Sequence, residues 1–391
     1  MNTPLIRALI PLLVCSATTA WAGPLDPPAG AVAPTAKPLR EVEPRTAVNA
    51  TNTPGDADSL FKITAPGSYY LTGNITGVTG KHGIEIVASG VTLDLNGFDL
   101  VGVPGTGIFD GVSVTVSGLY NIAVVNGSVR GWADAGVDLS GSSNCRIEGV
   151  SAKGNSGNGI AAGSGIAVSN CTAYANSGDG ISVGSDSTVS HCTSNGNMGA
   201  GISVSPGNTV TSCTANANGG SGIHGTSSGV RVSNCTAHLN TGTGILLYKG
   251  STVLNCTASL NTFAGIGVNE GSIVLNCAAY QNTGVGISTG SGCTVADCTV
   301  HLNTDDGVKC PSSCVIRNNT SSDNGGAGIR TSDSGNRIEG NSSTGNDRGV
   351  RVDGSGNVVI RNTCAGNTTN WTLTAGNVCG PILDRTAPGS A

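Results

Sequence analysis

The sequence is poor in charged and aromatic side chains. Of its 391 residues, 11% are charged and 3% are aromatic, and histidine occurs 5 times. The net charge of −5 and the lack of a long basic run argue against nucleic acid as a partner. The histidines are dispersed, without the spacing of an H-x-H or HExxH metal site, so we predict no metal site. No cofactor is expected; Ca²⁺ is left open, although no motif supports it.

Long hydrophobic runs are also missing, except at the N-terminus. The first residues, MNTPLIRALIPLLVCSATTAWA, contain one early charge at Arg7, a short apolar run, and the small residues Ala20 and Ala22. This is the pattern of a secretory signal with an A-x-A cleavage site, and the apolar run is short for a membrane span. We therefore predict a signal peptide at 1–22 and a secreted protein, extracellular or periplasmic, without a membrane span.

The segment 23–56 contains no periodic apolar pattern. It is rich in proline instead: Pro24, Pro27, Pro28, Pro34, Pro38, Pro44 and Pro54. Such a composition is typical of an extended linker, so we predict a Pro-rich arm here and not part of a core.

The rest of the chain is an internal repeat without helical periodicity. A Gly followed by Ile or Val recurs every 21 residues, with one step of 22, from Ile160 to Val350. Asn and Cys recur in the same frame, and the asparagines Asn176, Asn197, Asn218, Asn240, Asn261, Asn282, Asn303 and Asn324 form the clearest column. Each period contains short β-type runs separated by Gly, Asn, Ser and Asp, which are strand and turn signals.

A unit of this size cannot bury a core alone, so it must stack on copies of itself. We predict an all-β solenoid in which each strand pairs in parallel with its counterpart one coil away, about 4.8 Å distant. Each column then becomes a ladder, with isoleucines inside and asparagines hydrogen-bonded along the turns. The predicted solenoid spans 57–382 in about 14 coils, followed by a C-terminal tail at 383–391, with Trp371 as a lid.

The units NCTAYANSGDGISV, NCTAHLNTGTGILL and NNTSSDNGGAGIRT, with the earlier VTLDLNGFDL, resemble the right-handed parallel β-helix of the pectin-lyase-like superfamily. The similarity is strongest to exported bacterial β-helix repeat proteins. It implies a single-stranded right-handed parallel β-helix, but no single activity, because the superfamily includes lyases, hydrolases, epimerases, adhesins and inert scaffolds.

The cysteines are interpreted mainly as core residues. The chain has 14 cysteines, of which Cys15 falls in the predicted signal, leaving thirteen. In-register neighbours such as Cys171 and Cys192 point the same way, which keeps their Cβ atoms wider apart than a disulfide prefers. The ladder cysteines are therefore predicted to be small buried hydrophobes. The disulfide candidates lie outside this column: Cys310 with Cys314, and Cys364 with Cys379.

Any function must lie on the surface, and one outward column carries three cations in successive coils: Lys309, Arg330 and Arg351. Acids occur in the adjoining turns, and we predict a ligand-binding set of these three cations with Asp305, Asp306 and His301. The alternative is a solvated patch whose charges pair with one another. Enzymes of the resembled superfamily that process uronates use cations beside acids in this way, but no active-site signature of theirs fits this chain, and no catalytic residue is predicted.

Two functions remain. The first is a non-catalytic surface or extracellular protein that binds, or provides a scaffold, through its long face. The alternative is a carbohydrate-active enzyme or binder, of lyase or epimerase type, acting on an acidic polysaccharide through the basic C-terminal coils. The expected partner is an acidic polysaccharide or a cell-surface component, and we expect a monomer.

Overall fold

The computed structural model describes residues 43–103 and 107–380. The chain divides into two compact units, 1–44 and 45–391, and everything below concerns the second. The predicted signal peptide and tail, and the arm up to residue 42, lie outside the described residues.

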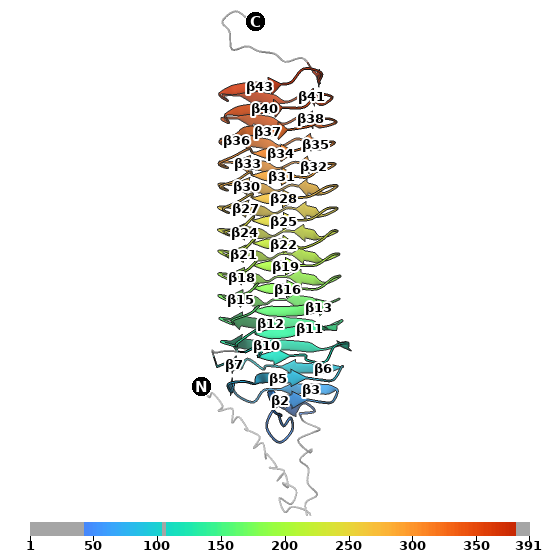
Figure 1. Cartoon of the computed structure of the whole chain (residues 1–391), viewed down its shortest axis with the longest axis vertical. Helices are drawn as coiled ribbons and strands as arrows, with labels where there is room; N and C mark the ends of the chain where they lie inside the picture. Colours follow the sequence, from blue (N-terminus) through green and yellow to red (C-terminus); the bar gives the residue numbers. More distant parts are fainter. Residues whose placement is uncertain (1–42, 104–106, 381–391) are drawn as a thin grey trace, which may run out of the picture. The chain divides into compact units, whose positions relative to one another are not determined.

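Unit 45–391 is a coil of short parallel strands (Figure 1). Within the described residues, the strands form one sheet of 28 strands, here called sheet A, and one of 16, called sheet B. Each regular coil contributes one strand to sheet B and two to sheet A, and each strand pairs in register with the one a coil later, as Ile181 does with Ile202. The predicted all-β parallel solenoid is confirmed.

The strands of sheet B are β2 (Ser59–Ile63), β5 (His82–Ile86), β8 (Val112–Ser113), β9 (Leu119–Tyr120), β11 (Val137–Ser143), β13 (Ile160–Ser164), β16 (Ile181–Val183), β19 (Ile202–Val204), β22 (Ile223–Gly225), β25 (Ile245–Leu247), β28 (Ile266–Val268), β31 (Ile287–Thr289), β34 (Val308–Cys310), β37 (Ala327–Thr331), β40 (Arg348–Val352) and β43 (Thr369–Leu373).

Sheet A begins with the strands β1 (Thr46–Ala47), β3 (Gly67–Tyr70), β4 (Ile75–Thr76), β6 (Val91–Asp94), β7 (Asp99–Val101), β10 (Ala123–Arg130), β12 (Arg146–Lys153), β14 (Ala167–Ser169), β15 (Thr172–Tyr174), β17 (Thr188–Ser190), β18 (Thr193–Asn195), β20 (Thr209–Thr211), β21 (Thr214–Asn216) and β23 (Arg231–Ser233). It continues with β24 (Thr236–His238), β26 (Thr252–Leu254), β27 (Thr257–Ser259), β29 (Ile273–Leu275), β30 (Ala278–Tyr280), β32 (Thr294–Ala296), β33 (Thr299–His301), β35 (Val315–Arg317), β36 (Thr320–Ser322), β38 (Arg337–Glu339), β39 (Ser342–Thr344), β41 (Val358–Ile360), β42 (Thr363–Ala365) and β44 (Val378–Cys379).

The coil starts earlier than the sequence predicted. Strand β1 lies in the segment assigned to the Pro-rich arm, yet it pairs with Tyr69 and Tyr70 of β3 and is followed by the buried Val48. Flanking prolines hid this short β-type run. The path of sheet B from β2 to β43 contains 15 strands among the described residues, so the expected count of about 14 coils was slightly low.

The core follows from the alternation of side chains along each strand. Inward positions carry Ile on sheet B and Val and Ala on the two arms of sheet A, as in Ile245, Val253 and Ala258, all with no exposed surface. Because stacked copies repeat these residues, the interior is a continuous apolar column. Burying each Ile or Val side chain contributes about 1.5–3 kcal/mol relative to exposure.

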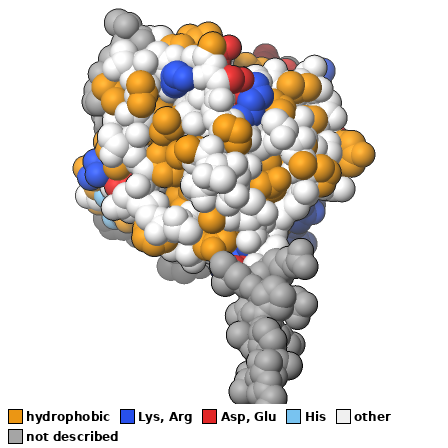
Figure 2. All heavy atoms as spheres, turned by 90° about the horizontal axis from the view of Figure 1, so that it is seen from below, with side chains coloured by type: hydrophobic (Ala, Val, Ile, Leu, Met, Phe, Trp, Pro, Cys, Tyr) orange, Lys and Arg blue, Asp and Glu red, His pale blue; other side chains and the backbone are white. Residues whose placement is uncertain are grey.

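The two ends of this column are covered differently. At the N-terminal end, Pro54 forms an antiparallel bridge with Phe61, which packs on the core. Figure 2 looks onto this end and shows hydrophobic and uncharged side chains with few charges among them. At the other end, Trp371 pairs with Val350, continues the isoleucine column and packs partly buried on the core, as expected of a lid.

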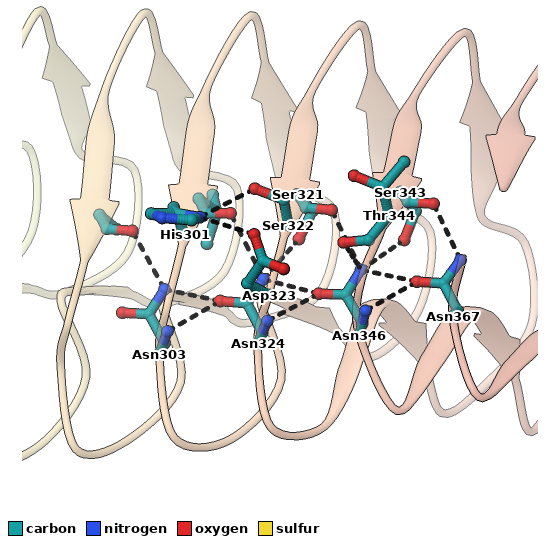
Figure 3. A network of polar contacts seen from close by, with 12 residues as sticks. His301, Asn303, Ser321, Ser322, Asp323, Asn324, Ser343, Thr344, Asn346 and Asn367 are labelled. Atoms are coloured by element: carbon teal, nitrogen blue, oxygen red, sulfur yellow. Dashed lines mark hydrogen bonds and ion pairs between the residues drawn. The ribbon is translucent and has the colours of Figure 1, made fainter. Parts of the chain in front are cut away.

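The asparagine ladder forms as predicted (Figure 3). The backbone N–H and the Nδ2 of Asn303 both donate to Oδ1 of Asn324, at 3.0 and 2.9 Å. Nδ2 of Asn303 also donates to the carbonyl of Ala279 in an earlier coil. The pattern repeats from Asn155 to Asn367, so each buried amide is satisfied by the coils on either side.

Cysteine plays the same part at a second corner. The backbone N–H of Cys192 donates to Sγ of Cys213 at 3.5 Å, and from Cys298 onward an asparagine accepts this hydrogen bond, beginning with Asn319.

A third ladder, which we did not predict, occupies the corner after sheet B. It mixes residue types: Ser187, Asn208, Ser251, Ser272, Cys293, Cys314, Asn336, Asn357 and Asn377.

Neither predicted disulfide is present in this structure. All thirteen cysteines between residues 43 and 380 are free thiols, including both candidate pairs. Cys364 is half-buried on β42 and Cys379 is exposed on β44. The ladder thiols are buried and hydrogen-bonded to the backbone; Sγ of Cys213, for example, donates to the carbonyl of Val189 at 3.6 Å. The prediction of small buried residues is confirmed for the ladder.

Candidate functional site

The predicted cations stack in register on the outer face of sheet B. Lys309 of β34 pairs with Arg330 of β37, which pairs with Arg351 of β40. All three side chains are half-buried. The column anticipated from the sequence therefore exists, and its charges decide whether it can hold a ligand.

Two of these cations are already neutralised. Asp353 accepts from Nε of Arg330 at 3.0 Å and from Nε of Arg351 at 2.6 Å, and Nη1 of Arg330 also donates to Asp306 at 3.4 Å. Burial raises the pKa of Asp353, but the two guanidinium groups outweigh it and lower the pKa overall. Lys309 forms no ion pair or hydrogen bond with any residue that the structure describes.

Among the described residues, no hydrogen bond or ion pair joins Lys309 to Asp305, Asp306 or His301. Asp306 is buried, and its Oδ1 accepts from the backbone N–H of Ala327 at 2.8 Å, so it supports the next coil. Asp305 is exposed in the same turn. His301 lies on β33 of sheet A, where Nδ1 is 2.9 Å from Oγ of Ser322 and 3.4 Å from Asp323 (Figure 3).

Sheet B has a groove of about 670 Å³ nearer the N-terminus. The residues that line it were not predicted from the sequence. The groove crosses β11, β13 and β16, and most lining residues are small: Gly118, Ala135, Ser140, Gly141, Ser142, Ser143, Ala161, Ala162, Gly163, Ser164, Ser182, Gly184 and Ser205. Asp134, Asp138 and Asn158 supply its larger polar side chains.

A distortion in β11 helps to form this groove. The pairing of β11 with β13 is regular from Val137 to Leu139, then shifts before Ser143. The residues of this irregular part, Ser140 to Ser143, line the groove. Bulges of this kind bend a strand and re-aim side chains, and they are frequent beside binding sites.

The acids of the groove lie close to further acids. Burial raises the pKa of Asp134, and the charges of Asp110 and Asp138 raise it further, against a smaller opposite effect of His82. Asp138 accepts from the backbone N–H of Ser140 at 2.8 Å. Asp110 is buried and accepts from Ser113 and from the backbone N–H of Ala135. Carboxyl groups in such unequal environments are typical of binding and catalytic sites.

The groove and the cations share one outward column of sheet B. Asp138 pairs with Ala161, Ala161 with Ser182, and the same register continues to Lys309. Eight strand spacings separate Asp138 from Lys309, roughly 38 Å. The signal for the acidic end was present in the sequence as Gly136-Val137-Asp138, which matches the Gly-Ile pattern but lies 23 residues before Ile160.

Within residues 43–103 and 107–380, no group of three or more His, Cys, Asp or Glu side chains could hold a metal ion. In the same part of the chain, no helix is both long and apolar enough to cross a membrane.

Comparison with known proteins identifies the fold family. A family model described as "Right handed beta helix region" matches residues 72–206, 110–263 and 225–369. No curated protein matches the sequence.

Two solved structures from Azotobacter vinelandii resemble the chain in fold. The A-module of mannuronan C-5 epimerase AlgE4 is 16% identical with a TM-score of 0.53, over 81% of this chain and 91% of that one. The AlgE6 A-module is 16% identical with a TM-score of 0.50, over 81% and 92%. Identities this low indicate a shared fold and not a shared activity.

Proposed function

The chain belongs to the right-handed β-helix family, and from this premise we propose that it is an exported binding protein that holds an extended glycan against sheet B. The observation that carries the proposal is the groove of about 670 Å³ across β11, β13 and β16. Its volume falls within the range of ordinary ligand pockets. The N-terminal segment, with its single early charge and small residues at Ala20 and Ala22, supports export.

The lining of the groove suits a polyhydroxylated chain. Small side chains let a ligand approach the backbone closely, while Asn158, Ser182 and Ser205 offer amide and hydroxyl groups. Few aromatic residues are available for stacking, so hydrogen bonds would dominate recognition. In-register strands also repeat the same groups about every 4.8 Å along the face, a spacing that suits an extended polymer.

Charge bears on which glycan is bound. Asp134 and Asp138 disfavour an anionic polymer in the groove. The names of the similar A-modules refer to mannuronan, an acidic polysaccharide, and on this protein such a ligand would fit better near Lys309, which has no ion-pair partner among the described residues. A neutral glycan in the groove is therefore the first expectation, and an acidic polysaccharide near Lys309 is the alternative.

A second candidate function is acid–base chemistry on the bound glycan. The raised pKa of Asp134 makes it a better proton donor to a glycosidic oxygen than an ordinary carboxyl group, and Asp138 beside it supplies the second carboxyl group that such a reaction uses. Two carboxyl groups with unequal environments are what this reaction class needs.

The test compares two matched substitutions in the outward column of sheet B. Ser182→Trp fills the groove, whereas Ser288→Trp places the same side chain at an equivalent position outside it. We expect Ser182→Trp to weaken binding on an array of neutral and uronate glycans at least tenfold, and Ser288→Trp to leave binding unchanged. Equal binding by both variants would refute the groove as the site, and loss only in Lys309→Ala would favour the alternative.

The same array distinguishes binding from catalysis. Incubation of the bound glycans with wild type and Asp134→Asn, followed by analysis of chain length, reports bond cleavage. Product formed by wild type and lost in Asp134→Asn, with binding retained, supports the catalytic candidate. Intact glycans in every sample support the non-catalytic binding protein.

A further inference from the structure

Three thiols meet inside the corner that joins β34 to β35. Cys310 is the last residue of β34, and Cys314 is the residue before β35; both are buried and point inward. Only the three residues of this corner, 311–313, separate Cys310 from Cys314. Cys293, one coil earlier, contacts Cys314: its backbone N–H donates to Sγ of Cys314 at 3.4 Å.

The two contacts of Cys314 differ in geometry. Cys293 and Cys314 occupy the same ladder position in successive coils, so their side chains point the same way and their Cβ atoms stay about one strand spacing apart. Cys310 and Cys314 instead approach each other from the two sides of one corner, four residues apart within a single coil. Bonding the second pair requires no shift between coils.

In the folded coil, Cys314 is the more acidic thiol of the two. Hydrogen bonds from the thiols of Cys293 and Cys310 lower the pKa of Cys314, against the opposing effect of burial. The same contact with Cys314, together with burial, raises the pKa of Cys310. Of the contacting pair, Cys314 is therefore the one that becomes the thiolate first.

We propose that Cys310 and Cys314 form a redox site, closing to a disulfide when the protein meets a disulfide oxidant, while Cys293 and the ladder thiols stay reduced. This inference is independent of the glycan proposal. The disulfide would convert the corner beneath Lys309, the residue next to Cys310, into a covalently closed loop.

The reaction balances as a thiol–disulfide exchange. The thiolate of Cys314 attacks an oxidised small or protein disulfide, forms a mixed disulfide and releases one thiol. The sulfur of Cys310 then attacks Sγ of Cys314 and displaces the second thiol, so two thiols are oxidised and one external disulfide is reduced. Because both sulfurs are buried, the oxidant must reach them while the coil is open, as during folding.

Trypsin makes this pair easy to follow, because cleavage after Lys309 and Arg317 places both cysteines in the peptide CPSSCVIR. The full chain is refolded from denaturant with oxidised glutathione, and a second sample is incubated in its native state. Free thiols are then alkylated and the digest is analysed by mass spectrometry. In the refolded sample we expect this peptide to lose two hydrogens and resist alkylation, while the other cysteine peptides are fully alkylated; in the native sample, where both sulfurs are buried, we expect much less of the modified peptide.

Substitutions separate this result from general oxidation. Cys310→Ser and Cys314→Ser should each abolish the modified peptide, whereas Cys293→Ser and the matched ladder control Cys213→Ser should retain it. A cross-link between CPSSCVIR and the peptide that contains Cys293 would overturn the proposed pairing. Full alkylation of Cys310 and Cys314 after refolding with oxidant would overturn the redox site itself, since access is then not limiting.

Discussion

The C-terminal coils of sheet B carry paired cations and acids, whereas the coils that form the groove carry neighbouring acids. In the C-terminal coils, Asp353 lies between Arg330 and Arg351, and its pKa is lowered because the charges are paired. In the N-terminal coils, Asp134 is partly buried beside Asp110 and Asp138, and its pKa is raised because like charges are crowded. The ion pairs of the C-terminal coils stabilise the coil, whereas the crowded acids near the groove can interact with a ligand.

The lengths of the coils explain this difference. From Ile84 the Gly-Ile or Gly-Val position recurs after 28, 25 and 23 residues, and only then settles at 21. The extra residues in the early coils enter the irregular part of β11 and the turns, and they line the groove. In the regular coils, the buried asparagine of each turn is hydrogen-bonded to the neighbouring coils. The binding site is therefore expected where the repeat is least regular.

The largest loss of stability in the regular coils is expected when a ladder asparagine is replaced. Asn218 accepts from the backbone N–H and Nδ2 of Asn197, and its own Nδ2 donates to Ser194 and Asn240. Asn218→Ala leaves these buried groups without partners, at about 1–3 kcal/mol each. We expect a loss of about 3 kcal/mol or more of stability, measured by urea unfolding followed by circular dichroism.

Two further asparagines serve as comparisons. Asn155 starts the ladder beside the groove coils and accepts only from the backbone N–H of Trp132, so Asn155→Ala should destabilise less than Asn218→Ala. Asn195 lies on the outside of β18 and makes one long contact with Asn216, so Asn195→Ala should be nearly neutral. Equal effects at Asn195 and Asn218 would contradict the ladder as the source of stability.

The next largest loss of stability is expected when the ion pairs of the C-terminal cations are removed. Arg330→Ala removes the ion-pair partner of the buried Asp306 and one of the two ion-pair partners of Asp353, and we expect thermal unfolding to show a loss of about 1–3 kcal/mol. Lys309→Ala, one coil away in the same column, should change stability by less than about 0.5 kcal/mol. The reverse order would mean that Lys309 has a structural role and is not available for a ligand.

The repeat itself was predictable from the sequence. A fixed spacing places Ile160 and Ile181 at equivalent positions, and stacking is the only way for so short a unit to bury them. The same spacing predicted the asparagine ladder and the register of Lys309, Arg330 and Arg351. These features depend only on which residues recur, which a sequence states directly.

The site could not be predicted in the same way. Asp134 and Asp138 belong to coils of irregular length, so their column is lost when positions are counted in steps of 21. The partners of Arg330 depend on a buried Asp306 in one turn and Asp353 beyond the strand, which no spacing rule connects. The third ladder was missed because Ser, Cys and Asn share a geometric role there and not a residue type.

The smallest and most specific effect should come from pH, with opposite signs at the two ends. Asp353 has a lowered pKa in the folded chain, so its stabilising contribution is present above its unfolded pKa, near 3.8, and is lost as the pH falls through the folded value. Asp134 has a raised pKa, so it destabilises the fold at neutral pH and ceases to do so as the pH falls below about 4. At pH 7 we therefore expect Asp353→Asn to lower the melting temperature and Asp134→Asn to raise it, each by roughly 1–3 °C. The difference at Asp134 should vanish near pH 3, whereas the difference at Asp353 should shrink as the pH falls below 3.8. Calorimetric scans from pH 3 to 8 would measure this, and shifts of the same sign at pH 7 would show that the two ends do not differ in how their charges are satisfied.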